Sequence, residues 1–185
     1  DCRVIPNQNT LCVATYQGDL APNFMALGAE VTLVSPEGER KIPLSEFYRL
    51  DGMKKNVLKP GEFMLKITLP KDSFDYTGSY QKLRLRESWD FPEAGISAVW
   101  KKGDYSTLKI ASTALESIPR VHAEQVSDFA VSWKKGTSLS ELSDAVRKSV
   151  KPVNNTALPP NYRKSVVRIL TKRALKNIGL SLIHI

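Results

Sequence analysis

The chain has 185 residues, of which 42% are apolar and 25% are charged, a composition typical of a globular protein with a hydrophobic core. No apolar run approaches the roughly 18 to 20 residues that a membrane-spanning helix needs, so we expect no membrane contact. The net charge of +8 could indicate nucleic-acid binding. However, the basic stripe has no interleaved aromatic residue that would stack on bases, which favours a solvated face or a surface for an acidic partner. The stripe consists of Lys164, Arg168, Lys172 and Lys176.

The beginning of the chain carries no recognisable targeting segment. Asp1 opens it, and no charged region followed by an apolar stretch comes after, as a signal peptide would require. The chain holds two cysteines, Cys2 and Cys12, too few for a disulfide framework. We therefore expect a cytoplasmic protein.

The first 70 residues are expected to mix helix and strand. Asp19 is a suitable N-cap for a short helix from Leu20 to Leu27, which Gly28 would end. Two β-prone runs at 30–35 and 40–44 flank a turn and predict an antiparallel hairpin. Residues 63–69 alternate in polarity, which predicts a strand with one apolar face. That face would consist of Phe63, Leu65, Ile67 and Leu69.

The second part is expected to be a small sheet covered by helices. Residues 71–79 are polar and rich in turn formers, and three predicted strands follow at 80–86, 96–101 and 107–112. Ser138 and Glu141 form a capping box at the start of a helix, and a last amphipathic helix is expected over 162–178. Its buried face would hold Val166, Ile169 and Leu170.

The fold class is therefore α+β, with two domains expected. The first covers residues 1–72 and the second residues 77–179. The last six residues, 180–185, resemble the translation of an adapter used in sequencing libraries, and we expect them to be a non-native tail.

Several local strings carry a more specific resemblance, and their order and spacing agree. They are GDLAP at 18–22 with MALGAEV at 25–31, GER at 38–40 with IPL at 42–44, ITLP at 67–70, YQK at 80–82, and VR at 167–168 with RAL at 173–175. Together they resemble the FAD-carrying subunits of the xanthine dehydrogenase, carbon monoxide dehydrogenase and 4-hydroxybenzoyl-CoA reductase family of molybdenum hydroxylases. The resemblance extends over nearly the whole chain, to about Gly179.

The resemblance implies a fold and a function. The fold would be the second part of a PCMH-type FAD-binding domain, followed by a domain like the C-terminal domain of the carbon monoxide dehydrogenase flavoprotein. The function would be an oxidoreductase subunit that relays electrons through FAD between iron–sulfur centres and an external two-electron carrier such as NAD. The molybdenum cofactor would lie on a large partner subunit and a 2Fe-2S centre on a small one. The family's glycine-rich pyrophosphate loop has no counterpart here, so we expect a C-terminal fragment that is inactive alone.

The resemblance also suggests cofactor-binding residues but no catalytic residue. Gly18 and Asp19 match positions near the flavin ribityl chain, where a carboxylate accepts hydrogen bonds from hydroxyl groups. The alternative for Asp19 is the N-cap role. Met64 matches an apolar position of the flavin pocket, and Lys82 matches a lysine near the cofactor, although an exposed strand lysine is an equal alternative. Neither His122 nor His184 has neighbours at metal-ligand spacing.

The two cysteines are interpreted separately. Cys2 and Cys12 resemble the second half of a four-cysteine set that holds a 4Fe-4S cluster in one branch of the family. Such a cluster requires four thiolates, so these two residues form an incomplete set. The alternative is that they are two unrelated buried cysteines.

A different class of function is left open by the sequence. The basic last helix would also suit a non-catalytic interaction module that binds an acidic partner or nucleic acid. Flavin absorbance discriminates between this hypothesis and the flavoprotein hypothesis.

Overall fold

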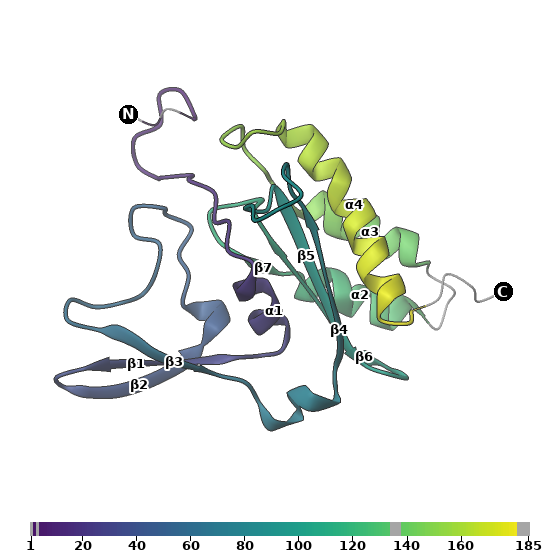
Figure 1. The fold of residues 1–185 in the computed structure, drawn as a ribbon, viewed down its shortest axis with the longest axis horizontal. Helices are drawn as coiled ribbons and strands as arrows, with labels where there is room; N and C mark the ends of the chain where they lie inside the picture. The colour runs from purple at the N-terminus through teal and green to yellow at the C-terminus, as the bar shows by residue number, and fades with distance from the viewer. Residues whose placement is uncertain (1, 3, 134–137, 181–185) are drawn as a thin grey trace.

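The computed structural model describes residue 2, residues 4–133 and residues 138–180. These residues form two antiparallel sheets with four α-helices, which confirms the α+β class (Figure 1). In chain order, the elements are α1 (Leu20–Ala26), β1 (Glu30–Ser35), β2 (Gly38–Pro43), η1 (Leu44–Glu46), β3 (Phe63–Thr68), η2 (Lys71–Asp75), β4 (Thr77–Leu83), β5 (Ala94–Lys101), β6 (Asp104–Thr113), β7 (Arg120–Val121), α2 (Ala123–Trp133), α3 (Leu139–Ser149) and α4 (Pro160–Asn177).

The first sheet has the order β2-β1-β3. The predicted hairpin is confirmed, because β1 pairs with β2 in continuous antiparallel register from Glu30 and Pro43 to Ser35 and Gly38. Val31 and Leu33 of β1 are fully buried and pack with Leu44 after the hairpin. The apolar side chains of one β1 face therefore form the small core of this sheet.

The predicted apolar face of β3 is wrong, because the strand contains an irregularity. Val34 of β1 pairs with Phe63, while Val31 pairs with Ile67, and the register shifts between them. Val34 and Val31 are three positions apart on β1, so their cross-strand partners lie on opposite faces of the sheet. Phe63 and Ile67 therefore do not share a face, and the strand exposes apolar side chains on both sides.

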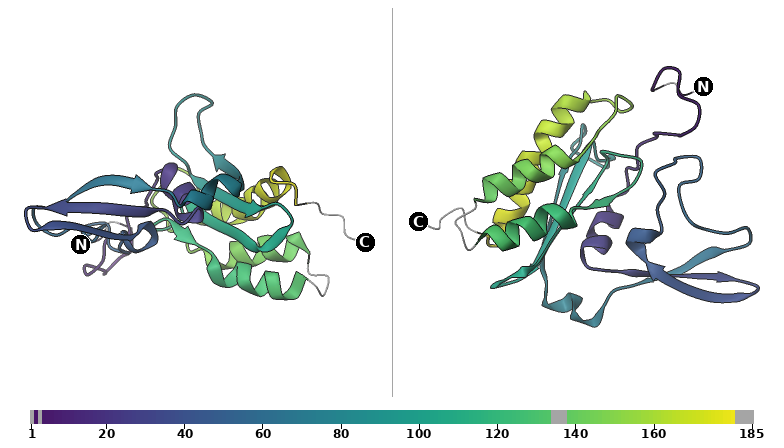
Figure 2. Two further views of the ribbon diagram at one scale, coloured as in Figure 1. Left: turned by 90° about the horizontal axis from the view of Figure 1, so that it is seen from below. Right: turned by 180° about the vertical axis from the view of Figure 1, so that it is seen from behind.

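The second sheet has the order β4-β5-β6-β7 and is covered on both faces. Helices α2, α3 and α4 pack on one face, and the short α1 packs on the other (Figures 1 and 2). Strand β5 is buried along most of its length, with Ile96 and Ala98 in the cluster on the α2–α4 side and Val99 against Ala26 of α1. Strand β4 ends at Leu83, so residues 84–86 lie in a loop and not in the predicted strand.

The last two helices fulfil most of the sequence prediction. Ser138 accepts the Glu141 N–H, and Glu141 accepts the Ser138 N–H, so the capping box begins α3 as expected. Val166 and Leu170 of α4 are buried, but Ile169 is 48% exposed, so its predicted place in the core is wrong. The buried face of α4 instead includes a fully buried arginine, Arg163, which no polarity pattern would predict.

The basic stripe lies at the edge of this buried face. Lys164, Arg168 and Lys172 are half-buried, and Lys176 is exposed. Arg168 donates to the Ser140 hydroxyl of α3 at 3.2 Å, and its Nε lies 3.2 Å from Asp144 Oδ1. Part of the stripe therefore joins two helices.

The end of the described chain packs against the core. Leu180, which the sequence analysis assigned to a tail, is 1% exposed and donates its N–H to the Leu175 carbonyl. Residues 181–185 lie outside the described residues. Over the described parts, the structure contains no helix with both the length and the apolar character needed to span a membrane.

Candidate functional site

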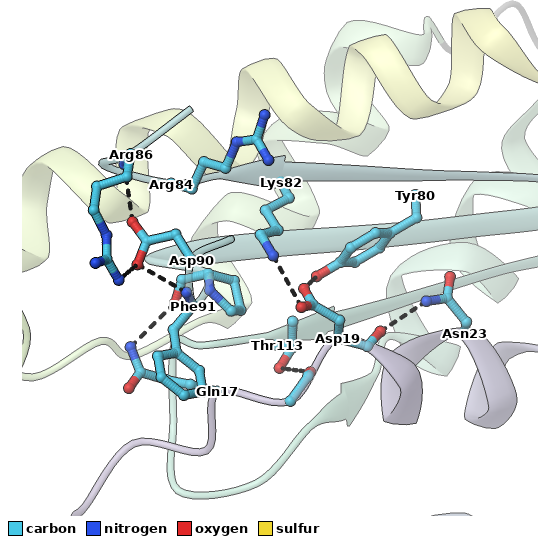
Figure 3. Close-up of polar contacts among 12 residues, drawn as sticks. Gln17, Asp19, Asn23, Tyr80, Lys82, Arg84, Arg86, Asp90, Phe91 and Thr113 are labelled. Atoms are coloured by element: carbon cyan, nitrogen blue, oxygen red, sulfur yellow. Dashed lines mark hydrogen bonds and ion pairs between the residues drawn. The ribbon is translucent and has the colours of Figure 1, made fainter. Parts of the chain in front are cut away.

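The carboxylate of Asp19 points across to strand β4 (Figure 3). Tyr80 donates its hydroxyl to Asp19 Oδ1 at 2.6 Å, and Lys82 Nζ donates to Asp19 Oδ2 at 2.9 Å. Asp19 is the N-cap residue of α1, as expected, but its side chain makes no capping hydrogen bond. The carboxylate is instead held by two donors that lie two residues apart, on one face of β4.

The chain before Asp19 is fixed to strand β6 and the turn that follows it. Tyr16 N–H donates to the Glu116 carbonyl, Ala114 N–H donates to the Tyr16 carbonyl, and the Thr113 hydroxyl donates to the Gly18 carbonyl at 2.9 Å. A Cβ at Gly18 would lie 2.4 Å from the Tyr16 hydroxyl, so any other residue there would require the Tyr16 ring to move. These contacts position Gly18 and Asp19 beside the second sheet.

Gly18, Asp19 and Lys82 line a pocket of about 490 Å³. The Asp19 side chain is 41% exposed and the Lys82 side chain 20% exposed, so both polar groups remain accessible. The remaining lining residues come from residue 17 and from the β4–β5 loop, and they are Gln17, Arg84, Ser88, Trp89, Asp90 and Phe91. The pocket thus combines a carboxylate and cations with aromatic rings.

Asp90 organises the β4–β5 loop on the far side of this pocket. Its carboxylate accepts the N–H groups of Leu85 and Arg86 and a guanidinium N–H of Arg86 at 3.0 Å. These donors, the Arg86 guanidinium first, lower the pKa of Asp90 to about 2. The same loop leaves Trp89 90% exposed and Phe91 64% exposed. Two aromatic surfaces are therefore available next to the polar groups.

The structure does not bring Met64 to this pocket. Met64 lies in β3 and packs against the core cluster of the first sheet, and it is not among the residues that line the pocket of Asp19 and Lys82. The assignment of Met64 to a cofactor site therefore stays a prediction from the resemblance.

Cys2 and Cys12 line a second, larger cavity of about 660 Å³. Both thiols are free, and the backbone N–H of Ile5 lowers the pKa of Cys2 because it donates to the sulfur. Asp51 accepts the N–H of Cys12 and that of Met53, which places Met53 on the wall of the same cavity. No group of three or more His, Cys, Asp or Glu in the described ranges is placed to hold a metal ion.

Sequence reasoning assigned no role to Tyr80 or Thr113. Both act on the Gly18–Asp19 segment from strands more than sixty residues away. The spacing of Tyr80 and Lys82 was a usable signal, because residues i and i+2 of a strand share a face. The contact of Thr113 had no signal, because it depends on how α1 packs against β6.

The comparisons with known proteins concern the sequence and the fold. Residues 10–72 match the family model described as the FAD binding domain in molybdopterin dehydrogenase. The FAD-binding subunit of an aldehyde oxidoreductase of Escherichia coli is 34% identical over 92 residues, covering 48% of this chain and 29% of that protein. A putative xanthine dehydrogenase FAD-binding subunit of Escherichia coli is 24% identical over 170 residues, covering 89% and 57%. The chain thus spans less than two thirds of the length of either relative.

A solved structure supports the same relationship at the level of the fold. A chain of carbon monoxide dehydrogenase from Hydrogenophaga pseudoflava superposes with a TM-score of 0.75 at 22% identity, covering 87% of this chain and 56% of that chain. The resemblance inferred from the sequence is confirmed: residues 10–72 match the FAD-binding domain of molybdopterin dehydrogenase, and the chain is similar to FAD-binding subunits of aldehyde and xanthine oxidoreductases.

Proposed function

We propose that this chain is the part of an FAD-binding subunit that holds the flavin end of the cofactor in a molybdenum-hydroxylase-type oxidoreductase. The observation that carries the proposal is the convergence of Gly18, Asp19 and Lys82 on one pocket beside exposed aromatic rings. This set suits a flavin with its ribityl chain, because hydroxyl groups need acceptors and a tricyclic ring packs well on apolar or aromatic surfaces. FAD, when bound, would supply the exchange of single electrons and electron pairs.

The residues of the site would bind and orient the cofactor. Each Asp19 oxygen accepts one protein hydrogen bond and retains capacity to accept another from a hydroxyl group in the pocket. Lys82 supplies a cation for a reduced flavin or a phosphate, and its pairing with Asp19 fixes its position. Trp89 and Phe91 would exclude water from one side of the pocket.

The partners of the subunit are part of the same proposal. A large subunit would carry the molybdenum cofactor and a small subunit a 2Fe-2S centre, with NAD as the external electron carrier. The named relatives are FAD-binding subunits of aldehyde and xanthine oxidoreductases, which supports this division of labour. We further propose a cytoplasmic location, the two-domain division at residues 72–77, and inactivity of this chain alone.

Cys2 and Cys12 extend the proposal to a 4Fe-4S cluster in the full-length protein. They face one cavity, and a lowered pKa of the Cys2 thiol favours the thiolate that a metal ligand requires. Two further thiolates would have to come from residues other than those of this chain. Iron analysis of the full-length protein tests this part separately, with about four irons per chain expected.

The test of the central proposal is the visible spectrum of the full-length protein before and after acid release of its cofactor. We expect flavin absorbance, and FAD in the released material. Asp19→Ala should reduce the bound FAD, whereas Asp72→Ala, which removes a surface carboxylate paired with Lys101, should not. A well-folded, colourless protein would overturn the proposal and favour the interaction module.

A further inference from the structure

The position of the Asp19 carboxylate depends on a hydrogen bond from the side chain of Tyr80. Tyr80 extends from β4, and its hydroxyl reaches Asp19 Oδ1 at 2.6 Å (Figure 3). A bond this short from a hydroxyl to a carboxylate is of the charge-assisted kind, which is about twice as strong as a bond between neutral groups. Burial and the nearby Asp19 charge both raise the pKa of Tyr80, so the phenol keeps its proton and remains a donor.

Gly95 of β5 provides the space through which Tyr80 reaches Asp19. Gly95 pairs with Lys82 in the sheet, two positions along from the pair of Tyr80 with Ser97 and therefore on the same face. A Cβ at Gly95 would lie 2.6 Å from the Tyr80 hydroxyl oxygen and 2.7 Å from Thr113 Cγ2. The absence of a side chain at this position is therefore a requirement for the Tyr80–Asp19 contact.

We propose that Tyr80, in the slot formed by Gly95, is a positioning residue that fixes the Asp19 carboxylate for flavin binding. Without the hydroxyl, Asp19 Oδ1 loses its donor, and the carboxylate retains the hydrogen bond from Lys82 to Oδ2. The carboxylate is then free to rotate. Its negative charge, which the Tyr80 hydroxyl no longer partly neutralises, also acts more strongly on the pocket. Both effects act on a bound flavin, the first on its affinity and the second on its redox potential. This inference rests on the proposed function.

The test uses the full-length protein with Tyr80→Phe and, as a matched control, Tyr162→Phe. Tyr162 is 51% exposed on α4, so its variant removes the same atom away from the pocket. After removal and titration of FAD, Tyr80→Phe should raise the dissociation constant about tenfold, as expected for loss of a hydrogen bond to a charged group. It should also shift the flavin potential to more negative values, because reduction adds negative charge near the less compensated carboxylate. Tyr162→Phe should change neither quantity.

A double-mutant cycle separates positioning from folding. Gly95→Ala should weaken FAD binding in both backgrounds, because its Cβ also meets Thr113 Cγ2, but by less in the Tyr80→Phe background, where the clash with the Tyr80 hydroxyl is gone. A purely structural role would change the thermal midpoint of the apoprotein and leave the potential of bound flavin unaltered. An unchanged affinity and potential in Tyr80→Phe would overturn the inference while the proposed function stood. A wild-type protein that binds no flavin would overturn both.

Discussion

The two sheets of this protein differ in how completely they are enclosed. The second sheet has helices on both faces and a continuous cluster of buried side chains, whereas the first has a small cluster and an edge strand, β3, with exposed apolar residues. The candidate site takes Asp19 from the start of α1 and Lys82 from β4. The more deeply buried second sheet therefore supplies the donors that hold Asp19.

The largest effect is expected for Arg163, the fully buried arginine of α4. Its guanidinium donates to the carbonyls of Glu93 and Val153 at 2.9 and 3.0 Å, and to the Ala114 carbonyl. The Glu93 carboxylate, also buried, lies 3.9 Å away. Arg163→Ala would remove a buried donor from all three carbonyls and the cation next to the buried Glu93 carboxylate, so we expect a loss of about 3–5 kcal/mol in the free energy of unfolding. Urea unfolding followed by circular dichroism measures it.

Arg173 provides the control on the same helix. It is exposed, so Arg173→Ala should change the free energy of unfolding by less than about 0.5 kcal/mol. If the two arginine variants unfolded at similar urea concentrations, the buried guanidinium would not be the element that joins α4 to the second sheet.

The second effect concerns pH and His122. The ring is buried between Ser112 and Ser149, at 2.9 and 3.0 Å, and burial, followed by the charge of Arg120, lowers its pKa to about 4. The unfolded chain binds this proton near pH 6.5 and the folded chain near pH 4, so stability is lost as the pH falls through that interval. From pH 7 to pH 5 we expect a loss of about 2 kcal/mol in the free energy of unfolding.

His122→Gln should remove this dependence, because it removes the titrating group. The comparison is made above pH 5, where carboxylates in the unfolded chain remain largely ionised. A variant with the same pH slope as the wild type would show that another group is responsible.

The sequence predicted the regular parts of both regions, and the misses have identifiable causes. The hairpin of β1 and β2 and the capping box of Ser138 follow from local turn and cap chemistry, and both are confirmed. The apolar face of β3 was wrong because a register shift depends on the partner strand and not on the strand itself. Helix α2 and the short strand β7 were not anticipated.

The candidate site was predicted in part. The resemblance indicated Gly18, Asp19 and Lys82, and the structure brings these three together. It did not indicate that Asp19 is fixed by Tyr80, because that contact requires a glycine on a third segment, Gly95. Contacts among several distant segments leave no periodicity in the sequence, so they become visible only in the folded chain.

A third, smaller effect is expected at the capping box of α3. Ser138 accepts the Glu141 N–H, so Ser138→Ala leaves that donor without its side-chain acceptor. We expect a loss of about 1 kcal/mol in the free energy of unfolding. Ser165→Ala is the control, since Ser165 is exposed within α4 and bonds only a carbonyl of its own helix, that of Asn161. Equal losses in the two serine variants would argue against the cap as the cause.

The smallest effect should belong to Leu65 of β3, and it compares the two sheets directly. Leu65 is 51% exposed in the first sheet, and Leu108 of β6 is 3% exposed in the core of the second. Leu→Ala removes the same atoms at both positions, but only the buried site leaves a cavity. We therefore expect less than about 1 kcal/mol for Leu65→Ala and about 2–5 kcal/mol for Leu108→Ala in urea unfolding. A large loss in the free energy of unfolding for Leu65→Ala would mean that Leu65 is packed in solution, either against another copy of the chain or within its own sheet. Sedimentation of the wild-type chain distinguishes these two explanations. A small cost would mean that the exposed face of β3 contributes little to folding of this chain, so that the second sheet supplies most of its stability.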